Sequence, residues 1–253
     1  MTDKDLAFLE DCSNGELDVL VKIMLKKLTE ELTINDRYKK DAPNHKMYVD
    51  LIEEEFIKFG SHSIGRHFFG NKSYREIVAD VCKQTKTPFH KAASVERMEN
   101  ALLEKMLYDT WERLSPEERE KLLEELGKKA RFAMSKKGMG ASAFVSLLRM
   151  GGFASYTLPL IIANGVARFA LGRGLAFAAN AGLTRALGVI AGPVGMAVSS
   201  ILLVADIAGP AYTVTIPLVV YIAALRRMKE AEDMFGGIFS GSMDDDDEDD
   251  EED

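Results

Sequence analysis

Histidines, cysteines and carboxylates that could do chemistry are few in this chain and show no recognised spacing. His62 and His67 follow the acidic run Glu53 to Glu55, but a spacing of five does not place two imidazoles on one helical face, as an i, i+4 pair would. An i, i+4 pair of histidines is one motif that supplies two zinc ligands from a single helix. We therefore interpret both histidines as satisfied or exposed side chains, and we expect no metal and no other cofactor.

Cys82 and His90 are the second candidate, as a nucleophile and its base. A nucleophile–base pair needs a third group that orients the base, and no such motif accompanies these residues. Cys12 and Cys82 are 70 residues apart without a CxxC spacing, so neither a disulfide framework nor a zinc site is predicted. Buried structural cysteines in a reducing compartment are the better interpretation, and we expect no enzyme activity.

Short amphipathic helices are predicted for the first 140 residues. Three capping boxes, in which a serine and the glutamate three residues later satisfy each other's free amides, predict helix starts at Ser13/Glu16, Ser73/Glu76 and Ser115/Glu118. Pro116 suits the first turn of the third helix, and Gly127 is placed to end it in the left-handed conformation.

Two further helices are predicted from apolar periodicity. The first covers residues 45–59 and ends at Gly60, with Glu53 to Glu55 near the side opposite its apolar residues. The second runs from about Ser94 to Leu114 and buries Val95, Met98, Leu102, Met106 and Trp111. No alternating run with a hairpin turn predicts a strand. We expect an all-α fold: a helical bundle, an apolar Gly/Ala-rich C-terminal helical hairpin region and a disordered acidic tail.

An apolar segment dominates the second half of the chain. Residues 141–225 carry only five charged side chains, Arg149, Arg168, Arg173, Arg185 and Asp206. Charge-free windows of 18, 20 and 19 residues cover 150–167, 186–205 and 207–225, against the roughly 20 residues that cross hydrocarbon as a helix. Asp206 alone separates the last two windows, so the sequence favours a re-entrant hairpin with its tip at 206–210 over two full spans. A central hairpin inside a soluble helical domain is the alternative.

Basic clusters flank the apolar segment. Five cations and no anion lie before it, at Lys128, Lys129, Arg131, Lys136 and Lys137, and Arg226 and Arg227 follow it. Basic residues at both ends would keep both flanks on the cytoplasmic side of a membrane. We predict that these seven residues contact lipid headgroups or a partner.

Interior polar and small residues give two further predictions. An Asp at a hairpin tip must reach water or pair with an Arg, so Asp206 is a candidate partner of Arg185 or Arg173. Small residues recur at every fourth position and predict flat faces on which helices pack closely. These residues are Gly174, Ala178, Gly182, Ala186, Gly188 and Gly192. Packing of this kind between two chains would give a homo-oligomer.

The formal net charge of −8 comes from the C-terminus, because residues 244–253 are all acidic. Without them, 32 basic residues face 30 acidic ones. No basic face of the kind that binds nucleic acid is indicated, so we expect no nucleic-acid partner. We interpret the acidic run as a solvated tail, with the alternative hypothesis that it shields the basic clusters from anionic lipid.

These patterns divide the chain into four predicted segments: a small helical module at 1–34, a soluble bundle at 35–137, the apolar region at 138–230 and the tail at 231–253. The start of the chain has no basic and apolar leader pattern. We therefore expect a cytoplasmic protein, peripheral to or inserted in the inner (cytoplasmic) membrane.

Several motifs resemble one family. The runs NAGLTR at 180–185, AGPVG at 191–195 and DIAGPAYTVTIP at 206–217, together with DLAFL at 5–9 and LDVLV at 17–21, resemble the YaaW-like family of bacterial proteins. Residues 45–110 are similar, more faintly, to chaperones for assembly of the ubiquinol:cytochrome c reductase. The resemblance implies a helical protein with no established activity and no catalytic residues to carry over.

Two functions follow as expectations. The first is a non-enzymatic, membrane-associated protein that acts through its apolar half in stress response, membrane remodelling or pore formation. The second is a soluble chaperone or assembly factor that shelters a hydrophobic client of a membrane protein complex.

Overall fold

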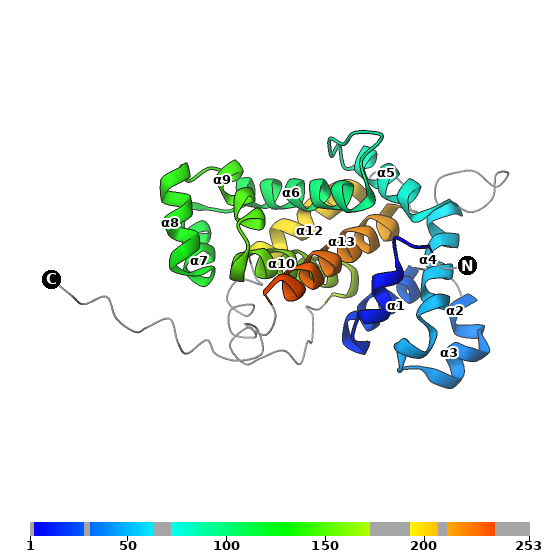
Figure 1. Cartoon of the computed structure of the whole chain (residues 1–253). Coiled ribbons are helices and arrows are strands. Elements are labelled where there is room, and N and C mark those ends of the chain that lie inside the picture. The colour runs from blue at the N-terminus through cyan, green and yellow to red at the C-terminus, as the bar shows by residue number, and fades with distance from the viewer. Residues whose placement is uncertain (1–2, 28–30, 63–71, 173–192, 207–211, 236–253) are drawn as a thin grey trace.

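The computed structural model of the chain describes residues 3–27, 31–62, 72–172, 193–206 and 212–235. These residues form twelve α-helices and three 3-10 turns, and they contain no strand (Figure 1). The prediction of an all-helical protein is therefore confirmed. The tail at 236–253 lies outside the described residues, so its predicted disorder stays a prediction.

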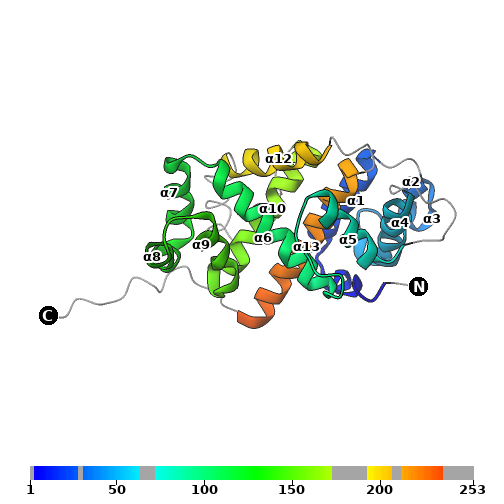
Figure 2. The same ribbon diagram turned by 90° about the horizontal axis from the view of Figure 1, so that it is seen from above.

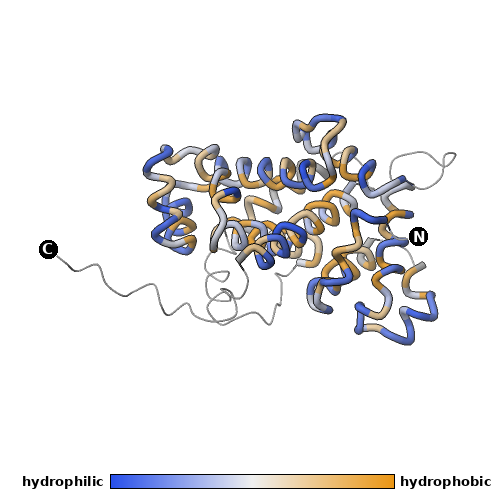
Figure 3. The backbone as a smooth tube through the Cα atoms, in the orientation of Figure 1, coloured by the Kyte–Doolittle hydropathy of each residue, from blue (hydrophilic) through white to orange (hydrophobic). Residues whose placement is uncertain are grey.

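Three apolar helices form the centre of the molecule. α10 (Gly152–Leu171) packs against both α13 (Tyr212–Phe235) and α12 (Pro193–Asp206). α6 (Val95–Arg113) crosses this layer, and α1 (Asn14–Lys27) packs on α10 and α13 (Figure 2). Hydrophobic residues follow α10, α12 and the first part of α13 through the interior (Figure 3). Much of the apolar segment is thus core in this structure.

The remaining elements lie at the two ends of this core (Figure 1). One end holds α7 (Pro116–Glu125), α8 (Gly127–Lys137), α9 (Ala141–Ser146) and the turn η3 (Leu147–Arg149). At the other end lie η1, α2, α3, η2, α4 and α5, spanning Ala7–Asp11, Glu31–Ile34, Asp36–Asp41, His45–Tyr48, Val49–His62 and Tyr74–Gln84.

Local sequence signals account for several boundaries. Ser73 and Glu76 form a complete capping box at α5, Ser115 and Glu118 form one at α7, and Ser13 exchanges the same pair of bonds with Glu16 before α1. Each box satisfies two amides that helix geometry leaves free. All three predicted helix starts are confirmed, and so is the long helix, which Ser94 caps.

The helix predicted at 45–59 differs from the structure at both ends. Residues 45–48 form a 3-10 turn, and α4 continues through Gly60 to His62. Gly60 does not end the helix. It allows α4 to pack closely on α5, because a Cβ atom at this position would lie 2.5 Å from Cδ1 of Ile77. Glu53 does not lie on an exposed side either: it is only 2% exposed, on the face that also buries Phe56.

The two ends of the described chain meet in the core. The Tyr221 hydroxyl of α13 donates to the carbonyl of Glu16 at 3.2 Å, and the Arg226 guanidinium donates to the carbonyl of Asp5. Residues from the first and third predicted segments therefore share one hydrophobic core.

Candidate functional site

An exposed group of cations around one aromatic side chain lies on α8. Gly127 has a φ of +83°, a conformation that favours glycine, and it lets the chain turn from α7 directly into α8. Ala130 and Met134, one helical turn apart, face inward and are buried. The opposite face of α8 is therefore left to solvent.

Phe132 occupies the middle of that outer face and is 63% exposed. Lys128 and Lys136 lie one turn before and after it, with Lys129 beside Lys128, and all are exposed. The Lys136 ammonium lies 5.0 Å from the centre of the Phe132 ring, within the range of a cation–π contact. We call Lys128, Lys129, Phe132, Lys136 and Lys137 the α8 surface.

Two residues of the predicted basic cluster, Arg131 and Lys137, contact side chains of neighbouring helices. Arg131 forms an ion pair with Glu120 of α7, and its second nitrogen lies 3.8 Å from Glu124. Lys137 donates to the Ser146 hydroxyl at 3.1 Å, which ties the end of α8 to α9. Arg131, Glu120 and Phe132 also line a shallow hollow of about 280 Å³ together with Leu123, Ser135 and Met139. Arg131 thus faces α7, while the lysines of the α8 surface stay exposed.

Arg226 and Arg227, the other predicted headgroup contacts, lie on α13 and have partners within the protein. Arg226 pairs with the buried Glu99 at 2.5 Å, and its guanidinium lies 4.1 Å from the Phe8 ring centre. The Tyr74 hydroxyl donates to the other Glu99 oxygen at 2.5 Å. Burial raises the pKa of the Glu99 carboxyl, and the Arg226 charge opposes that shift.

Arg227 has partners inside the protein as well. It pairs with Glu230 at 3.0 Å and donates to the Leu148 carbonyl at 2.9 Å. Sequence reasoning missed the acceptors of both arginines, because Glu99 and Leu148 are distant in the chain and carry no local signal.

The predicted Asp206 pair lies outside the described residues. α12 ends at Asp206, but the Asp206 side chain and residues 173–192, which hold Arg173 and Arg185, are not described. The same holds for the small-residue faces at Gly174, Ala178, Gly182, Ala186, Gly188 and Gly192. The pairing and the packing faces stay predictions.

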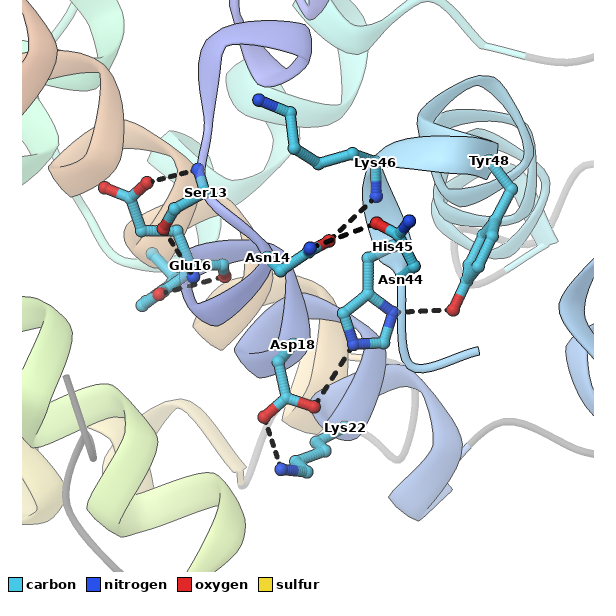
Figure 4. Close-up of polar contacts among 10 residues, drawn as sticks. Ser13, Asn14, Glu16, Asp18, Lys22, Asn44, His45, Lys46 and Tyr48 are labelled. Atoms are coloured by element: carbon cyan, nitrogen blue, oxygen red, sulfur yellow. Dashed lines mark hydrogen bonds and ion pairs between the residues drawn. The ribbon is translucent and has the colours of Figure 1, made fainter. Parts of the chain in front are cut away.

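A buried polar cluster was not predicted. His45 lies between Asp18 of α1, 3.3 Å from its Nε2, and the Tyr48 hydroxyl, 2.6 Å from its Nδ1 (Figure 4). Asn14 accepts from the Lys46 amide at 3.0 Å, which pins the same turn to α1. No sequence signal joins Asp18 to His45, since the contact arises only when η2 packs on α1.

This Asp–His–Tyr arrangement has no room for a substrate. Tyr48 is 0% exposed, and burial raises the pKa of its phenol to about 12. A catalytic base has to reach the proton that it abstracts, and here both His45 nitrogens already contact side chains of the protein. The cluster therefore stabilises the junction of η2 with α1.

The cysteines are placed as structural residues. Cys82 lies buried with its thiol 3.8 Å from the Met98 carbonyl, while His90 is exposed and accepts from the Ala92 amide. Burial raises the pKa of both Cys12 and Cys82 to about 12. Among the described residues, no three His, Cys, Asp or Glu side chains gather as metal ligands; His67 is outside them.

Comparisons with known proteins identify relatives along most of the chain. A UPF0174 protein of Helicobacter pylori strain J99 is 36% identical over 231 residues, covering 88% of this chain and 91% of the relative. The UPF0174 protein YaaW of Escherichia coli K12 is 31% identical over 243 residues, covering 91% and 97%. The chain belongs to the UPF0174 family.

The UPF0174 assignment confirms the resemblance to the YaaW-like proteins. No family model and no solved structure matches the chain. The names of the UPF0174 relatives state a family and no activity, so function has to be argued from the residues.

Proposed function

We propose that this UPF0174 protein is a non-enzymatic protein that docks on an anionic membrane facing the cytoplasm through its α8 surface. The observation that carries the proposal is Phe132, an aromatic side chain that is 63% exposed in the middle of a lysine-rich helical face. Exposed aromatic side chains among lysines are typical of helices that lie at a membrane interface.

The magnitudes are those of a reversible attachment. A lysine near an anionic leaflet contributes about 1 kcal/mol, and burial of one large apolar side chain contributes about 1.5–3 kcal/mol. Four lysines and Phe132 would together give roughly 6 kcal/mol, which corresponds to a Kd of about 40 μM. The glutamates of α7 oppose this attraction. Because salt screens the attraction between exposed lysines and anionic lipid, high salt should release the protein from a membrane.

The apolar half has a different role in this proposal. One described helix, α10, is long and apolar enough to cross a membrane, but 67% of its apolar window is buried inside the protein, and a core helix meets the same criteria. We therefore propose that the protein docks on the membrane surface with its apolar helices still packed in the core. Insertion as a hairpin, with membrane remodelling or pore formation, would require α10, α12 and α13 to leave their present partners.

Vesicle sedimentation tests the docking. The full chain should sediment with vesicles that contain an anionic phospholipid and stay in solution with purely zwitterionic ones. Replacing the four lysines of the α8 surface by glutamine, or Phe132 by serine, should reduce the bound fraction. Lys39 and Lys40 of α3, exposed at the other end of the molecule (Figure 1), provide a matched control. Equal loss in the Lys39→Gln/Lys40→Gln variant would refute a specific α8 surface.

Cell fractionation tests the proposed location. Release from membranes by high salt would agree with peripheral docking, whereas retention through alkaline carbonate would mean that the apolar half is inserted. Leakage of dye from vesicles would further favour a pore former.

The second candidate, a soluble chaperone or assembly factor, has one supporting observation. Met139, Met150, Met196 and Met234 are each about half exposed or more, at 50%, 49%, 66% and 62%, and methionine-rich surfaces adapt to varied apolar partners. If the protein ignores vesicles but keeps an aggregation-prone transmembrane peptide soluble, the chaperone function is the better proposal. Depletion of one membrane complex in cells lacking the protein would support it.

A further inference from the structure

The acidic run at 244–253 and the α8 surface carry opposite charge within one chain. The run holds ten carboxylates and no cation, and α8 holds five cations and no carboxylate. We propose that residues 244–253 dock on the α8 surface of the same molecule and compete there with anionic lipid. The competition rests on the proposed function, whereas the docking itself does not.

Two hydrogen bonds show how near the end of α13 lies to α8. Lys137 of α8 contacts Ser146, and Arg227 of α13 contacts the carbonyl of Leu148, only two residues further along. The end of α8 and the last third of α13 therefore meet at the same short stretch of chain. Both views of the fold agree that α13 ends toward α8 and α9 (Figures 1 and 2).

The chain after α13 is long enough to reach the α8 surface. α13 extends from Arg227 to Phe235, about 12 Å at the rise of an α-helix. Residues 236–243 can then span roughly 26–29 Å before the acidic run begins. α3, the other exposed basic helix used above as a control, lies at the opposite end of the molecule (Figure 1).

Charge and tethering both favour this occupant. Tethering through a short linker gives a bound segment an effective concentration in the millimolar range, so even a contact with a Kd of about 100 μM would be mostly formed. Lys128, Lys129, Lys136 and Lys137 are all exposed, so a chain of carboxylates can reach them from solvent. Because the groups are exposed, the contact should weaken as salt shortens the Debye length to a few ångströms.

Zero-length carbodiimide cross-linking of the full chain tests the contact directly, because it joins a carboxylate only to an amine that touches it. At low salt and low protein concentration, peptide mapping should find the run at 244–253 joined to Lys128, Lys129, Lys136 or Lys137 within one molecule. Equal joining to Lys39 and Lys40, or none to α8, would overturn the proposal.

A full chain with the acidic run changed to Asn and Gln gives a second measurement. A synthetic peptide of residues 244–253 should bind this neutral-tail protein at low salt, and α8 lysine-to-glutamine changes should weaken binding about tenfold or more, while the Lys39→Gln/Lys40→Gln control should not. Absence of binding, or equal loss in the control, would refute the docking.

Vesicles separate this inference from the proposed function. If both hold, the neutral-tail protein should bind anionic vesicles more tightly than the natural chain, and the free peptide should displace it. If the peptide binds the α8 surface but neither chain binds vesicles, the docking stands and the membrane proposal fails. If both chains bind vesicles equally and no cross-link forms, the membrane proposal stands and the docking fails.

Discussion

Glu53 is a buried acid without a partner. It is 2% exposed, and neither carboxylate oxygen has a hydrogen bond. Asp3 and Glu10 face it from the N-terminal residues, Asp50 lies on its own helix, and the N-terminal amine opposes their effect. Burial, then these like charges, raises the pKa of Glu53 to about 7, so Glu53 is protonated in the folded protein at mildly acidic pH.

Glu53 should make stability fall as pH rises. The unfolded carboxyl ionises near pH 4.5 and the folded one near 7, so the folded state binds more protons between these values. The free energy of unfolding should therefore fall by about 2–3 kcal/mol from pH 4.5 to 7 and then level off. Urea unfolding of Glu53→Gln should lack this slope, and the exposed Glu54→Gln should keep it. A slope that survives in Glu53→Gln would contradict the assignment.

Arg226 should be far more important for stability than an exposed arginine. Its change to methionine leaves Glu99 buried without its counter-charge and frees the Asp5 carbonyl, which should cost about 3–5 kcal/mol. Arg149, 70% exposed and paired with Glu104, is the control, and its change to glutamine should cost less than about 1 kcal/mol. Chemical unfolding of both variants checks this, and similar losses would refute a special role for Arg226.

At this scale the sequence predicted charge and exposure on α8 but not the internal partners. The basic residues between Lys128 and Lys137 are close together in the sequence, so their cluster could be predicted. Arg226 also belongs to a basic cluster in the sequence, but in the structure it forms an ion pair with the buried Glu99. A buried ion pair depends on which helices pack together, which local spacing does not encode.

Helices α10 and α12 meet at a glycine. A Cβ atom on Gly165 would lie 2.7 Å from side-chain atoms of Val198, closer than carbon atoms approach in folded proteins. Gly60 serves α4 and α5 in the same way, through Ile77. These two close helix contacts therefore depend on single glycines within helices.

Gly165→Ala should force these two helices apart and reduce the free energy of unfolding by about 1–3 kcal/mol, as overpacking does. The control is Gly195→Ala in α12, where the new methyl would meet only the flexible Arg168 side chain at 3.2 Å. That change should be neutral or stabilising by up to about 1 kcal/mol, because alanine favours helix. Equal destabilisation of the two variants in thermal unfolding would contradict the packing argument.

The helix starts marked by capping boxes could be predicted at this scale, but both ends of the helix predicted at 45–59 could not. Capping boxes are local, so Ser13, Ser73 and Ser115 identified their helices correctly. A glycine at position 60 also suits the end of a helix, and only its contact with Ile77 shows that it has a packing role. Tertiary contacts, which the local sequence does not contain, decide whether a glycine ends a helix or allows a neighbouring helix to approach.

For the whole molecule, the sequence left open what surrounds its apolar segment. A charge-free stretch of about 20 residues suits a bilayer or a core equally well. In the structure α1, α6, α12 and α13 surround α10. The apolar faces of α1 and α6 were predictable, but their contact with residues more than 100 positions later was not.

α13 should be essential for folding as a whole. Its residues from Val214 to Leu225 are almost all buried against α10, α1 and α6. A chain ending before Tyr212 should therefore lose cooperative unfolding in circular dichroism, while one ending after Phe235 should keep it. A cooperative transition in the shorter chain would show that the core forms without α13.

The contacts of Glu16 and Asp5 with α13 also have a consequence for synthesis. Asp5 and Glu16 cannot form these contacts until Tyr221 and Arg226 are translated, roughly 10–40 s later at about 5–20 residues per second. During that interval the part of α1 that packs on α13 has no native partner. The nascent chain should therefore need a holding chaperone on the ribosome, and cells short of such chaperones should accumulate this protein as aggregates.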